Sequence, residues 1–501
     1  MRYRYIFWDF NGTVIDDVNN ALACVNDLLT EKGRQPITLK EYYNYVETPI
    51  VGFYRHILPP EEIDFEVISK GYHESYARRI DETQLAKGVY ELMHSLKEQG
   101  AHQYIITANH IDEVMHLLKR YGIDTCVDCV TGATNTKAES KTQRAKELFS
   151  SLNISHNDAL FIGDTLHDVE TANAMGIDCV LVEYGHQGKK LLRKQNVFTV
   201  ASIKEVENII RDGRTVDFHT HSSCSDGTLT PSQLVRHAEK SGLSAFALTD
   251  HDSVDGIKEA AYEAKNLNIE FIPGIEFSAA DKTETHIIGL FIDPENETLL
   301  STIKNLKDSR ERRMKDICSK LCGLGFDITY EEALKTAKGH FVGRAHIAKL
   351  MVEKGFCETA KECFDKYIGL GKPAYSEKHE LTAVQAVKAI KSAGGLAFLA
   401  HLNQTGYDLN ELRELLSVLK EVGLDGIEGY YPEYTAEQIS DYRSLALELG
   451  LALSGGSDYH ADMKPHIQIG VGTGNLKIPY YVLENLKNIS ETQHNKSDLL
   501  L

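Results

Sequence analysis

The stretch TVDFHTHSSCSDGTLTPSQLVRHAEKSGLSAFALTDHD, residues 215–252, contains a complete strand–helix–strand pattern. Its first apolar run leads into His219 and His221, which are two positions apart and therefore face the same side of a strand. Thr230 followed by Pro231 marks a helix start, because proline is favoured at the first helical position. A second apolar run ends at His251. The pattern predicts an α/β fold with polar side chains at the carboxyl ends of its strands.

Similar side chains recur at the ends of later apolar runs. Strands are expected at EFIPGIEFSA, HIIGLFID, LAFLAH, GIEGYY and ALSGGSD, with a helical stretch over about 295–372 between the second and the third. A single histidine is usually structural, but nine candidate metal ligands follow one another in this order: His219, His221, Asp226, His251, Glu276, His286, His401, Asp458 and His460. Imidazole and carboxylate without thiolate suit Mn²⁺, Zn²⁺ or Fe²⁺, and such a set can hold two or three ions. Clustered ions assist an in-line phosphoryl displacement.

This ordered set resembles the PHP (polymerase and histidinol phosphatase) superfamily of metal-dependent phosphoesterases over about 215–475. The resemblance implies a distorted barrel of about seven α/β units with a helical insertion, usually three metals, and all nine ligand positions filled. HFVGRAHIAKLMVEKG (340–355) and YIGLGKPAY (367–375) look like the branch that removes the 3′-phosphate from nucleoside 3′,5′-bisphosphates. Some members of that branch are 5′→3′ exonucleases on short RNA.

The same resemblance implies roles for residues outside the nine. Arg344 is expected to approach the substrate phosphate, although a place on the helix surface is the alternative. Asp250 is expected beside the substrate, and Asp250 and Asp252 flank His251 as supports that orient its imidazole.

The N-terminal part also alternates strands and helices, with strands at YIFWDF, QYIITAN, ALFIGD and CVLVEYG. Residues 17–86 interrupt the alternation with helical, polar sequence and are expected to form a cap. Strand ends offer a small set of reactive groups, Asp9, Thr107, Asp164 and Asp168, and Lys141 begins a helix. A carboxylate can attack phosphorus, Mg²⁺ takes carboxylate and phosphate oxygens, and a lysine with a hydroxyl neutralises the transferring group.

This arrangement resembles the haloacid dehalogenase (HAD) superfamily of phosphatases, of the phosphoglycolate-phosphatase-like type with a Rossmann-like core and a helical cap, over about 1–205. It implies Asp9 as the nucleophile and, with Asp164, as an Mg²⁺ ligand. Thr107 and Lys141 would contact phosphate, with Lys137 as the alternative lysine, and Asp168 would support the metal or the lysine.

One position departs from that family. Asn11 stands where the family has a second aspartate, which protonates the leaving oxygen and later activates water. Asparagine can hydrogen-bond to a substrate but cannot exchange a proton at neutral pH. General acid–base catalysis contributes about 10²- to 10⁴-fold in rate. We therefore expect weak turnover of activated phosphate esters, or phosphate binding without turnover.

Composition limits the remaining possibilities. With 501 residues and 42% apolar residues, the chain suits two large domains, placed at 1–210 and 215–480, followed by a polar tail at 481–501. The net charge of −19 argues against duplex DNA as a partner. A basic run at 307–316 is either a local basic pocket or a solvated helix face. Nine thinly spread cysteines suggest reduced thiols in a cytoplasmic protein, and no apolar run is long enough for a membrane span.

The sequence thus predicts a two-domain phosphoric ester hydrolase. Its stronger site would act on a small nucleotide or a short oligoribonucleotide with two to three Mn²⁺, Zn²⁺ or Fe²⁺ ions, and its N-terminal site would use Mg²⁺. The first alternative is another phosphomonoester, such as histidinol phosphate or a sugar phosphate. A second alternative makes the N-terminal domain a phospholigand-binding regulatory module. The oligomeric state is left open.

Overall fold

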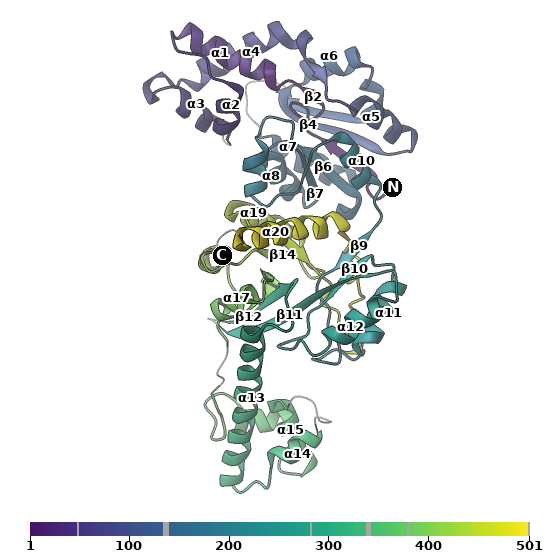
Figure 1. Ribbon diagram of the computed structural model, residues 1–501, viewed down its shortest axis with the longest axis vertical. Helices are drawn as coiled ribbons and strands as arrows, with labels where there is room; N and C mark the ends of the chain where they lie inside the picture. Colours follow the sequence, from purple (N-terminus) through teal and green to yellow (C-terminus); the bar gives the residue numbers. More distant parts are fainter. Residues whose placement is uncertain (48–49, 134–139, 281–282, 337–341, 378–380, 499–501) are drawn as a thin grey trace.

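Two α/β domains follow one another along the chain (Figure 1). The computed structural model describes residues 1–47, 50–133, 140–280, 283–336, 342–377 and 381–498. The first domain is built on a six-stranded parallel sheet. Its order is β5 (Cys129–Ala133), β4 (His102–His110), β1 (Tyr5–Trp8), β6 (Ala159–Gly163), β7 (Asp178–Val182) and β8 (Thr199–Val200). The predicted Rossmann-like architecture is therefore confirmed.

Helices cover both faces of this sheet because successive side chains of each strand point to opposite faces. Ile6 and Trp8 pack into a cluster with α5 (Val89–Glu98), α6 (Ile111–Tyr121) and α10 (Ile203–Arg211). Phe7 lies in a separate cluster with α7 (Lys141–Leu152) and α8 (Leu166–Met175). A short helix, α9 (Lys189–Lys194), precedes β8.

A helical cap lies between the short strands β2 (Ile15–Asp16) and β3 (Gln84–Leu85), which pair antiparallel. It consists of α1 (Val18–Glu31), α2 (Leu39–Tyr45), α3 (Val51–Ile57) and α4 (Phe65–Arg79). These helices share a small apolar core of their own. These two paired strands connect the cap to the sheet domain (Figure 1).

The second domain is an eight-stranded, barrel-like sheet. Its order is β15 (Ala452–Gly455), β14 (Gly426–Tyr430), β13 (Leu396–Leu399), β12 (Glu284–Leu290), β11 (Glu270–Ala280), β10 (Ala245–Leu248), β9 (Thr215–Asp217) and β16 (Ile478–Pro479). The chain beyond β9 pairs with the chain beyond β15, where Thr220 and Tyr459 form a parallel bridge. The helices are α11 (Pro231–Lys240), α12 (Ile257–Ala264), α17 (Ala383–Ser392), α18 (Leu409–Glu421) and α19 (Ala436–Leu449).

The barrel departs from a regular α/β repeat at β12, which pairs antiparallel with both of its neighbours. β11 ends at Ala280 and β12 begins at Glu284, which leaves too few residues for the crossover helix that a parallel pair requires. The predicted distorted barrel is confirmed, and this hairpin is one source of its distortion.

The helical insertion extends away from the barrel along α13 (Glu297–Gly323), whose far end carries α14 (Tyr330–Thr336) and α15 (Arg344–Glu353) (Figure 1). α16 (Ala360–Cys363) and a π-helical turn (Phe364–Ile368) complete it. Met314, Ile317 and Leu321 of α13 pack against Ile347 and Met351 of α15 in a separate core.

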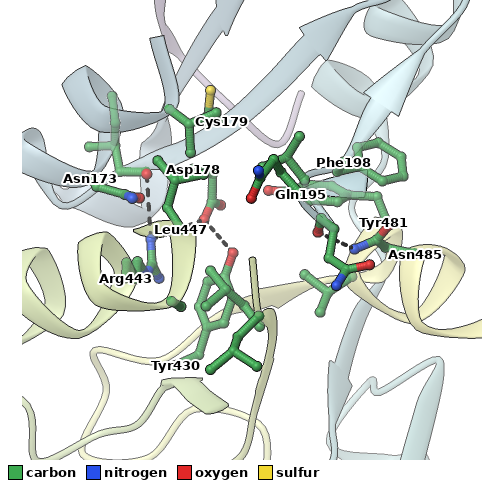
Figure 2. Close-up of a pocket in the computed structure, with 18 residues that line it drawn as sticks. Asn173, Asp178, Cys179, Gln195, Phe198, Tyr430, Arg443, Leu447, Tyr481 and Asn485 are labelled. Atoms are coloured by element: carbon green, nitrogen blue, oxygen red, sulfur yellow. Dashed lines mark hydrogen bonds and ion pairs between the residues drawn. The ribbon is translucent and has the colours of Figure 1, made fainter. Parts of the chain in front are cut away.

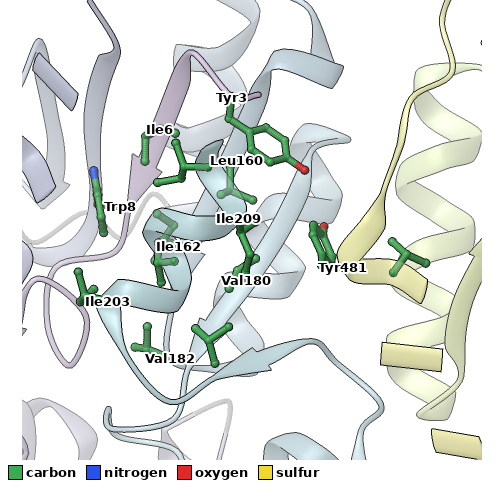
Figure 3. Close-up of a cluster of buried hydrophobic side chains, with 14 of the residues drawn as sticks. Tyr3, Ile6, Trp8, Leu160, Ile162, Val180, Val182, Ile203, Ile209 and Tyr481 are labelled. Carbon is green, nitrogen blue, oxygen red and sulfur yellow. The ribbon is translucent and has the colours of Figure 1, made fainter. Parts of the chain in front are cut away.

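The residues from 481 onward do not form a loose polar tail, and that expectation is wrong for the part that the structure describes. They belong to α20 (Tyr480–Asp498), which lies between the two domains (Figure 1). Tyr481, Leu483 and Leu486 are buried and join the same apolar cluster as Tyr3 and the core strands of the first domain (Figure 3).

A polar contact also joins the domains. Asp178, at the start of β7, accepts hydrogen bonds from the hydroxyls of Tyr3 at 2.7 Å and Tyr430 at 2.9 Å. The Arg443 guanidinium of α19 lies over the Tyr430 ring, beside a small cavity at the junction (Figure 2). Because Asp178, Tyr430 and Arg443 are all buried, the junction resembles a domain core more than a mobile contact.

Among the described residues, no helix is long and apolar enough to cross a membrane. All nine cysteines are free thiols, as their spacing predicted.

Candidate active sites

The barrel gathers the nine candidate ligands at one end. His219 and His221 follow β9, His251 follows β10, and His401 follows β13. The remaining ligands are Glu276 in β11, His286 in β12, Asp226 in the loop before α11, and Asp458 and His460 after β15. The carboxyl ends of parallel strands meet at one edge, so residues up to 241 positions apart in the chain become neighbours.

Glu276 lies at the centre of the cluster and is fully buried. Its Oε2 is 3.1 Å from Nε2 of His219 and 3.1 Å from Nε2 of His221. Its Oε1 is 2.8 Å from Nδ1 of His286 and 3.1 Å from Nε2 of His401. Nδ1 of His251 also lies 3.2 Å from Oε2. One carboxylate thus faces five imidazoles, which suits a residue that would contact more than one ion.

Asp226 and Asp458 complete the set. Oδ1 of Asp226 lies 3.2 Å from Nε2 of His460 and 3.6 Å from Nδ1 of His221, and its Oδ2 lies 3.8 Å from Nε2 of His251. Oδ1 of Asp458 lies 3.4 Å from Nε2 of His221 and 3.3 Å from Nδ1 of His460. The Asp226 side chain is 52% exposed, so the cluster opens to solvent on this side.

The donor atoms fit divalent metal ions. Among the described residues, His401 Nδ1 is buried without a hydrogen-bond partner. His221 Nε2 and His251 Nδ1 are also buried, and they face Glu276 Oε2 at 3.1 Å and 3.2 Å without the geometry of a hydrogen bond. A buried polar atom without a partner is costly, unless a metal takes its lone pair. Three subsets, each with at least three ligand atoms within 4.8 Å of one another, draw eight of the nine residues together. His401 joins them through Glu276.

Charge in the cluster is unevenly distributed. Burial lowers the pKa of His251 to about 3, which keeps that imidazole in the neutral form that binds metals. Burial also opposes charge on His221, but Asp458 and Glu276 outweigh it and raise the His221 pKa to about 9. Burial favours protonation of Glu276, but the histidines around it hold its pKa well below the usual range.

Two of the candidate ligands have strained backbone conformations. His401 has a φ of 24° and Asp458 a φ of 58°, in the left-handed region that ordinary residues avoid. Such strain persists where the surrounding structure imposes it, and it occurs often at functional sites.

Glu428, in β14, is a site residue that the sequence interpretation missed. It is fully buried, and its Oε1 lies 3.0 Å from Nδ1 of His219. Its Oε2 accepts a hydrogen bond from the His401 backbone N–H at 2.7 Å. Asp217 is a second omission, since it accepts from the backbone N–H groups of Ser457 and Gly470 and fixes the strand that leads to His219. A charged residue inside an apolar run was the available signal for both.

The structure separates the expected roles of Asp250 and Asp252. Asp250 accepts hydrogen bonds from the Ser222 N–H at 2.7 Å and the Ser225 hydroxyl at 2.6 Å, so it holds the loop that carries Asp226. Asp252 forms an ion pair with Arg310 of α13. The contacts of Asp250 are with its own loop, and they do not support the expectation that Asp250 binds substrate.

Arg344 begins α15 and lies over the Phe364 ring, with its guanidinium carbon 5.5 Å from the ring centre. Burial lowers the pKa of Arg313 of α13, and the nearby charge of Arg344 lowers it further. Arg310 and Arg313 are one turn apart, so they share a helix face. Part of the basic run at 307–316 therefore faces other protein groups rather than solvent. His340 and Phe341, at the start of the quoted motif, lie outside the described residues.

The N-terminal site centres on Lys141, the first residue of α7. Its ammonium group forms ion pairs with both Asp9 and Asp168, and all three side chains are buried. Burial opposes the lysine charge, but the two carboxylates outweigh it and raise the Lys141 pKa. Asp168 also caps α8 by accepting from the Thr165 N–H at 2.9 Å. Asp168 therefore contacts the lysine, which is one of its two expected roles. Lys137, the alternative lysine, lies outside the described residues.

Asp164 lies beside these groups, and one oxygen each from Asp9, Asp164 and Asp168 falls within 4.8 Å of the others. Burial raises the Asp164 pKa to about 6. Gly12 makes room for Asp164, because its φ is 74° and a Cβ there would lie 2.3 Å from Oδ2 of Asp164. A carboxylate set of this kind offers the hard oxygen ligands that Mg²⁺ requires.

Thr107, in β4, and Asn11, in the segment after β1, are linked through Asn109. The Thr107 hydroxyl accepts a hydrogen bond from the Asn109 N–H at 3.0 Å, and the Asn109 side chain donates to Oδ1 of Asn11 at 3.4 Å. Asn11 also donates to Asp17 at 2.7 Å. Asp17 and His186, which lies 3.1 Å from it, were not singled out in the sequence.

Comparison with known proteins assigns a family to each domain. Residues 217–464 match the model of the PHP domain, and residues 6–182 match that of haloacid dehalogenase-like hydrolases. The chain is 31% identical over 248 residues to a 3′,5′-nucleoside bisphosphate phosphatase of Chromobacterium violaceum, covering 49% of this chain and 87% of that protein. The chain belongs to the PHP family. It joins a PHP domain to a haloacid dehalogenase-like domain, which makes it a metal-dependent phosphoric ester hydrolase, as the motifs predicted.

Two further relatives are 5′–3′ exoribonucleases. The protein of Escherichia coli is 31% identical over 257 residues, covering 51% of this chain and 87% of that protein. The protein of Haemophilus influenzae is 38% identical over 160 residues, covering 32% of this chain and 58% of that protein. Each of the three matched regions covers about half of this chain or less, and the match to the Haemophilus influenzae protein spans less than two thirds of that relative.

Proposed function

We propose that the barrel site hydrolyses a phosphate ester of a small nucleotide, either a nucleoside 3′,5′-bisphosphate or the end of a short oligoribonucleotide. The observation that carries the proposal is the nine-residue cluster centred on the buried Glu276, which opens to solvent at Asp226 and has Arg310 of the helical insertion beside it. The bisphosphate phosphatase and exoribonuclease relatives act on substrates of these two kinds, as their names state.

The nine residues would hold two or three ions, with Mn²⁺ as our choice over Zn²⁺ or Fe²⁺. Such ions, when bound, activate water and neutralise the oxygens of a phosphate. The chain itself would orient the site, since Glu428 holds the His219 ring and Asp250 holds the loop of Asp226. Asp226, on the open side, would border the path by which substrate enters.

The arginines support a substrate that carries a second anionic group. Arg310 pairs with Asp252, the neighbour of His251, and Arg313 and Arg344 continue the positive charge away from the cluster. A substrate with two phosphates could place one at the cluster and the other near Arg344. A phosphomonoester such as histidinol phosphate or a sugar phosphate would leave these arginines unused, so we rank it second.

For the N-terminal site, we propose Mg²⁺-dependent phosphate binding with slow turnover. Asp9 and Asp164 would hold the ion, and Lys141 and Thr107 would contact the phosphate. Asn11 supplies no exchangeable proton, which supports slow hydrolysis or a regulatory role as a phospholigand sensor.

The substrate test is Mn²⁺-dependent phosphate release from adenosine 3′,5′-bisphosphate, a short 5′-phosphorylated RNA, histidinol phosphate and a sugar phosphate. We expect the highest kcat/KM with the first or the second. Arg344→Ala should lower kcat/KM on the bisphosphate by about 10- to 100-fold, the effect of one lost charge-assisted hydrogen bond. Lys349→Ala, an exposed change in the same helix, is the matched control. A preference for sugar phosphate, unaffected by Arg344→Ala, would overturn the substrate assignment.

A further inference from the structure

Five polar side chains meet where the cap joins the first domain: Asn11, Asp17, Tyr42, Tyr76 and His186. Asp17 is 1% exposed, Tyr76 3% and Tyr42 6%. Asn11 and His186 belong to loops around the sheet, and Asp17 lies at the junction between β2 and α1, where the cap begins. Tyr42 lies in α2 and Tyr76 in α4 of the cap. We refer to these five residues as the Asp17 cluster.

Asp17 accepts every hydrogen bond that its carboxylate can accommodate. Its donors are the Gly12 N–H at 2.8 Å, the Asn11 amide at 2.7 Å and the Tyr76 hydroxyl at 2.7 Å, and Nε2 of His186 lies 3.1 Å away. A carboxylate offers about four acceptor positions. Burial opposes charge on Asp17, but His186 and these hydrogen bonds outweigh it and hold the Asp17 pKa below its usual value. The group is therefore a buried anion that depends on its donors.

Asn11 contributes donors that an aspartate lacks. Its amide nitrogen donates to Oδ2 of Asp17 at 2.7 Å and to the Tyr76 hydroxyl at 2.9 Å. An ionised aspartate at this position has no proton to donate. It would instead place a second negative charge within hydrogen-bond distance of Asp17, in a buried environment where like charges repel strongly.

The cap is attached through the same groups. Tyr76 of α4 binds Asp17 directly, and the Tyr42 hydroxyl of α2 lies 2.9 Å from Nδ1 of His186. Each of these two helices therefore contributes one buried hydroxyl to the ion pair between Asp17 and His186. Disturbing Asp17 would leave Tyr76 and His186 without their shared acceptor.

We propose that Asn11 is the donor half of a latch that holds the cap on the sheet domain through Asp17. Asn11 is thus a positioning residue, paired with the carboxylate at position 17. It follows that Asn11→Asp alone does not restore an efficient phosphatase, because it breaks the latch. The paired exchange Asn11→Asp/Asp17→Asn keeps one amide and one carboxylate across the contact and should restore both the latch and an acid group at position 11.

The test uses the full chain in a His219→Ala background, so that the barrel site does not contribute hydrolysis. Two quantities are measured: amide hydrogen exchange in α2 and α4, and Mg²⁺-dependent hydrolysis of p-nitrophenyl phosphate. Asn11→Asp should raise exchange in both helices by about tenfold, the loss of one charge-assisted hydrogen bond, with little gain in hydrolysis. The paired exchange should return exchange to near the parent level and raise hydrolysis by about 10²- to 10⁴-fold.

Two further variants keep the latch testable. Asn305→Asp, which adds an exposed charge on α13, should change neither quantity. If Asn11→Asp does not fold, Asn11→Ala removes the donor without adding charge and should still raise exchange in α4. Unchanged exchange in Asn11→Ala, or a full gain of hydrolysis in Asn11→Asp with unchanged exchange, would refute the latch. The hydrolysis readout rests on the proposed phosphate site: restored exchange without hydrolysis in the paired variant would support the latch and refute that site.

Discussion

Replacing Glu428 with glutamine removes one charge beside the proposed metal site and almost no volume. In the native site, one carboxylate oxygen faces Nδ1 of His219 at 3.0 Å and the other accepts from the His401 N–H at 2.7 Å. Glutamine has only one oxygen, so its NH₂ group must face one of these two donors. The variant therefore loses a hydrogen bond in a position that is fully buried.

Two effects follow and can be measured separately. An unsatisfied buried donor costs about 1–3 kcal/mol of unfolding free energy, which urea unfolding of the metal-free protein would record. Loss of a residue that orients a histidine ligand typically weakens metal binding about 10- to 100-fold. That range corresponds to about 1.4–2.8 kcal/mol of binding free energy. Calorimetric titration of chelator-treated protein with Mn²⁺ would measure it directly.

Glu437→Gln is the matched control, because Glu437 is exposed in the first turn of α19. It should leave both quantities unchanged. If Glu428→Gln lowered stability but bound Mn²⁺ within about twofold of wild type, Glu428 would be a structural residue and the orienting argument would be wrong, since it requires at least a tenfold loss.

Three other changes test different parts of the molecule. His219→Ala should reduce bound metal, measured by elemental analysis, and abolish phosphate release from nucleotide substrates; near-native rates would contradict the ligand assignment. Asp178→Asn should cost about 1–3 kcal/mol in urea unfolding, because two buried tyrosine hydroxyls share that carboxylate; an unchanged midpoint would show that the junction does not depend on it. Deleting 481–501 removes buried side chains of α20 and should lower the melting temperature, as calorimetry would show, whereas a freely mobile tail could be removed without effect.

Local sequence pattern was sufficient for most of the barrel site. His219 and His221 share a strand face because the side-chain period of a strand is two, and parallel strands bring their ends to one edge. The same reasoning did not identify Glu428, whose partner His219 is 209 positions away. Within GIEGYY it resembled any polar residue of a strand, and only pairing of β14 in the barrel places it under a ligand.

The N-terminal site shows a similar limit. Asn11 by itself indicated a missing acid, which is a statement about one residue type. In the folded protein, the Asn11 side chain donates hydrogen bonds to Asp17, six positions along the chain, and to Tyr76 of the cap. The sequence alone does not show these contacts. The C-terminal segment was misjudged because its composition is polar, although Tyr481, Leu483 and Leu486 form a short apolar face. Most of the stability of such a helix comes from packing its apolar face against a partner surface.

The sequence by itself predicted the two α/β domains, the order of nine candidate metal ligands and the carboxylates Asp9, Asp164 and Asp168, because these follow from strand periodicity and residue chemistry. It left the choice between Lys141 and Lys137 open. Only the tertiary structure showed which groups contact the residues in and around the two sites: Glu428 contacts His219, Arg310 contacts Asp252, and Asp17 contacts Asn11. Their partners come from other strands and helices, and a hydrogen bond or ion pair between distant segments leaves no local periodicity. The candidate ligands can thus be recognised in the sequence, whereas the residues that hold them in place can be identified only once the chain is folded.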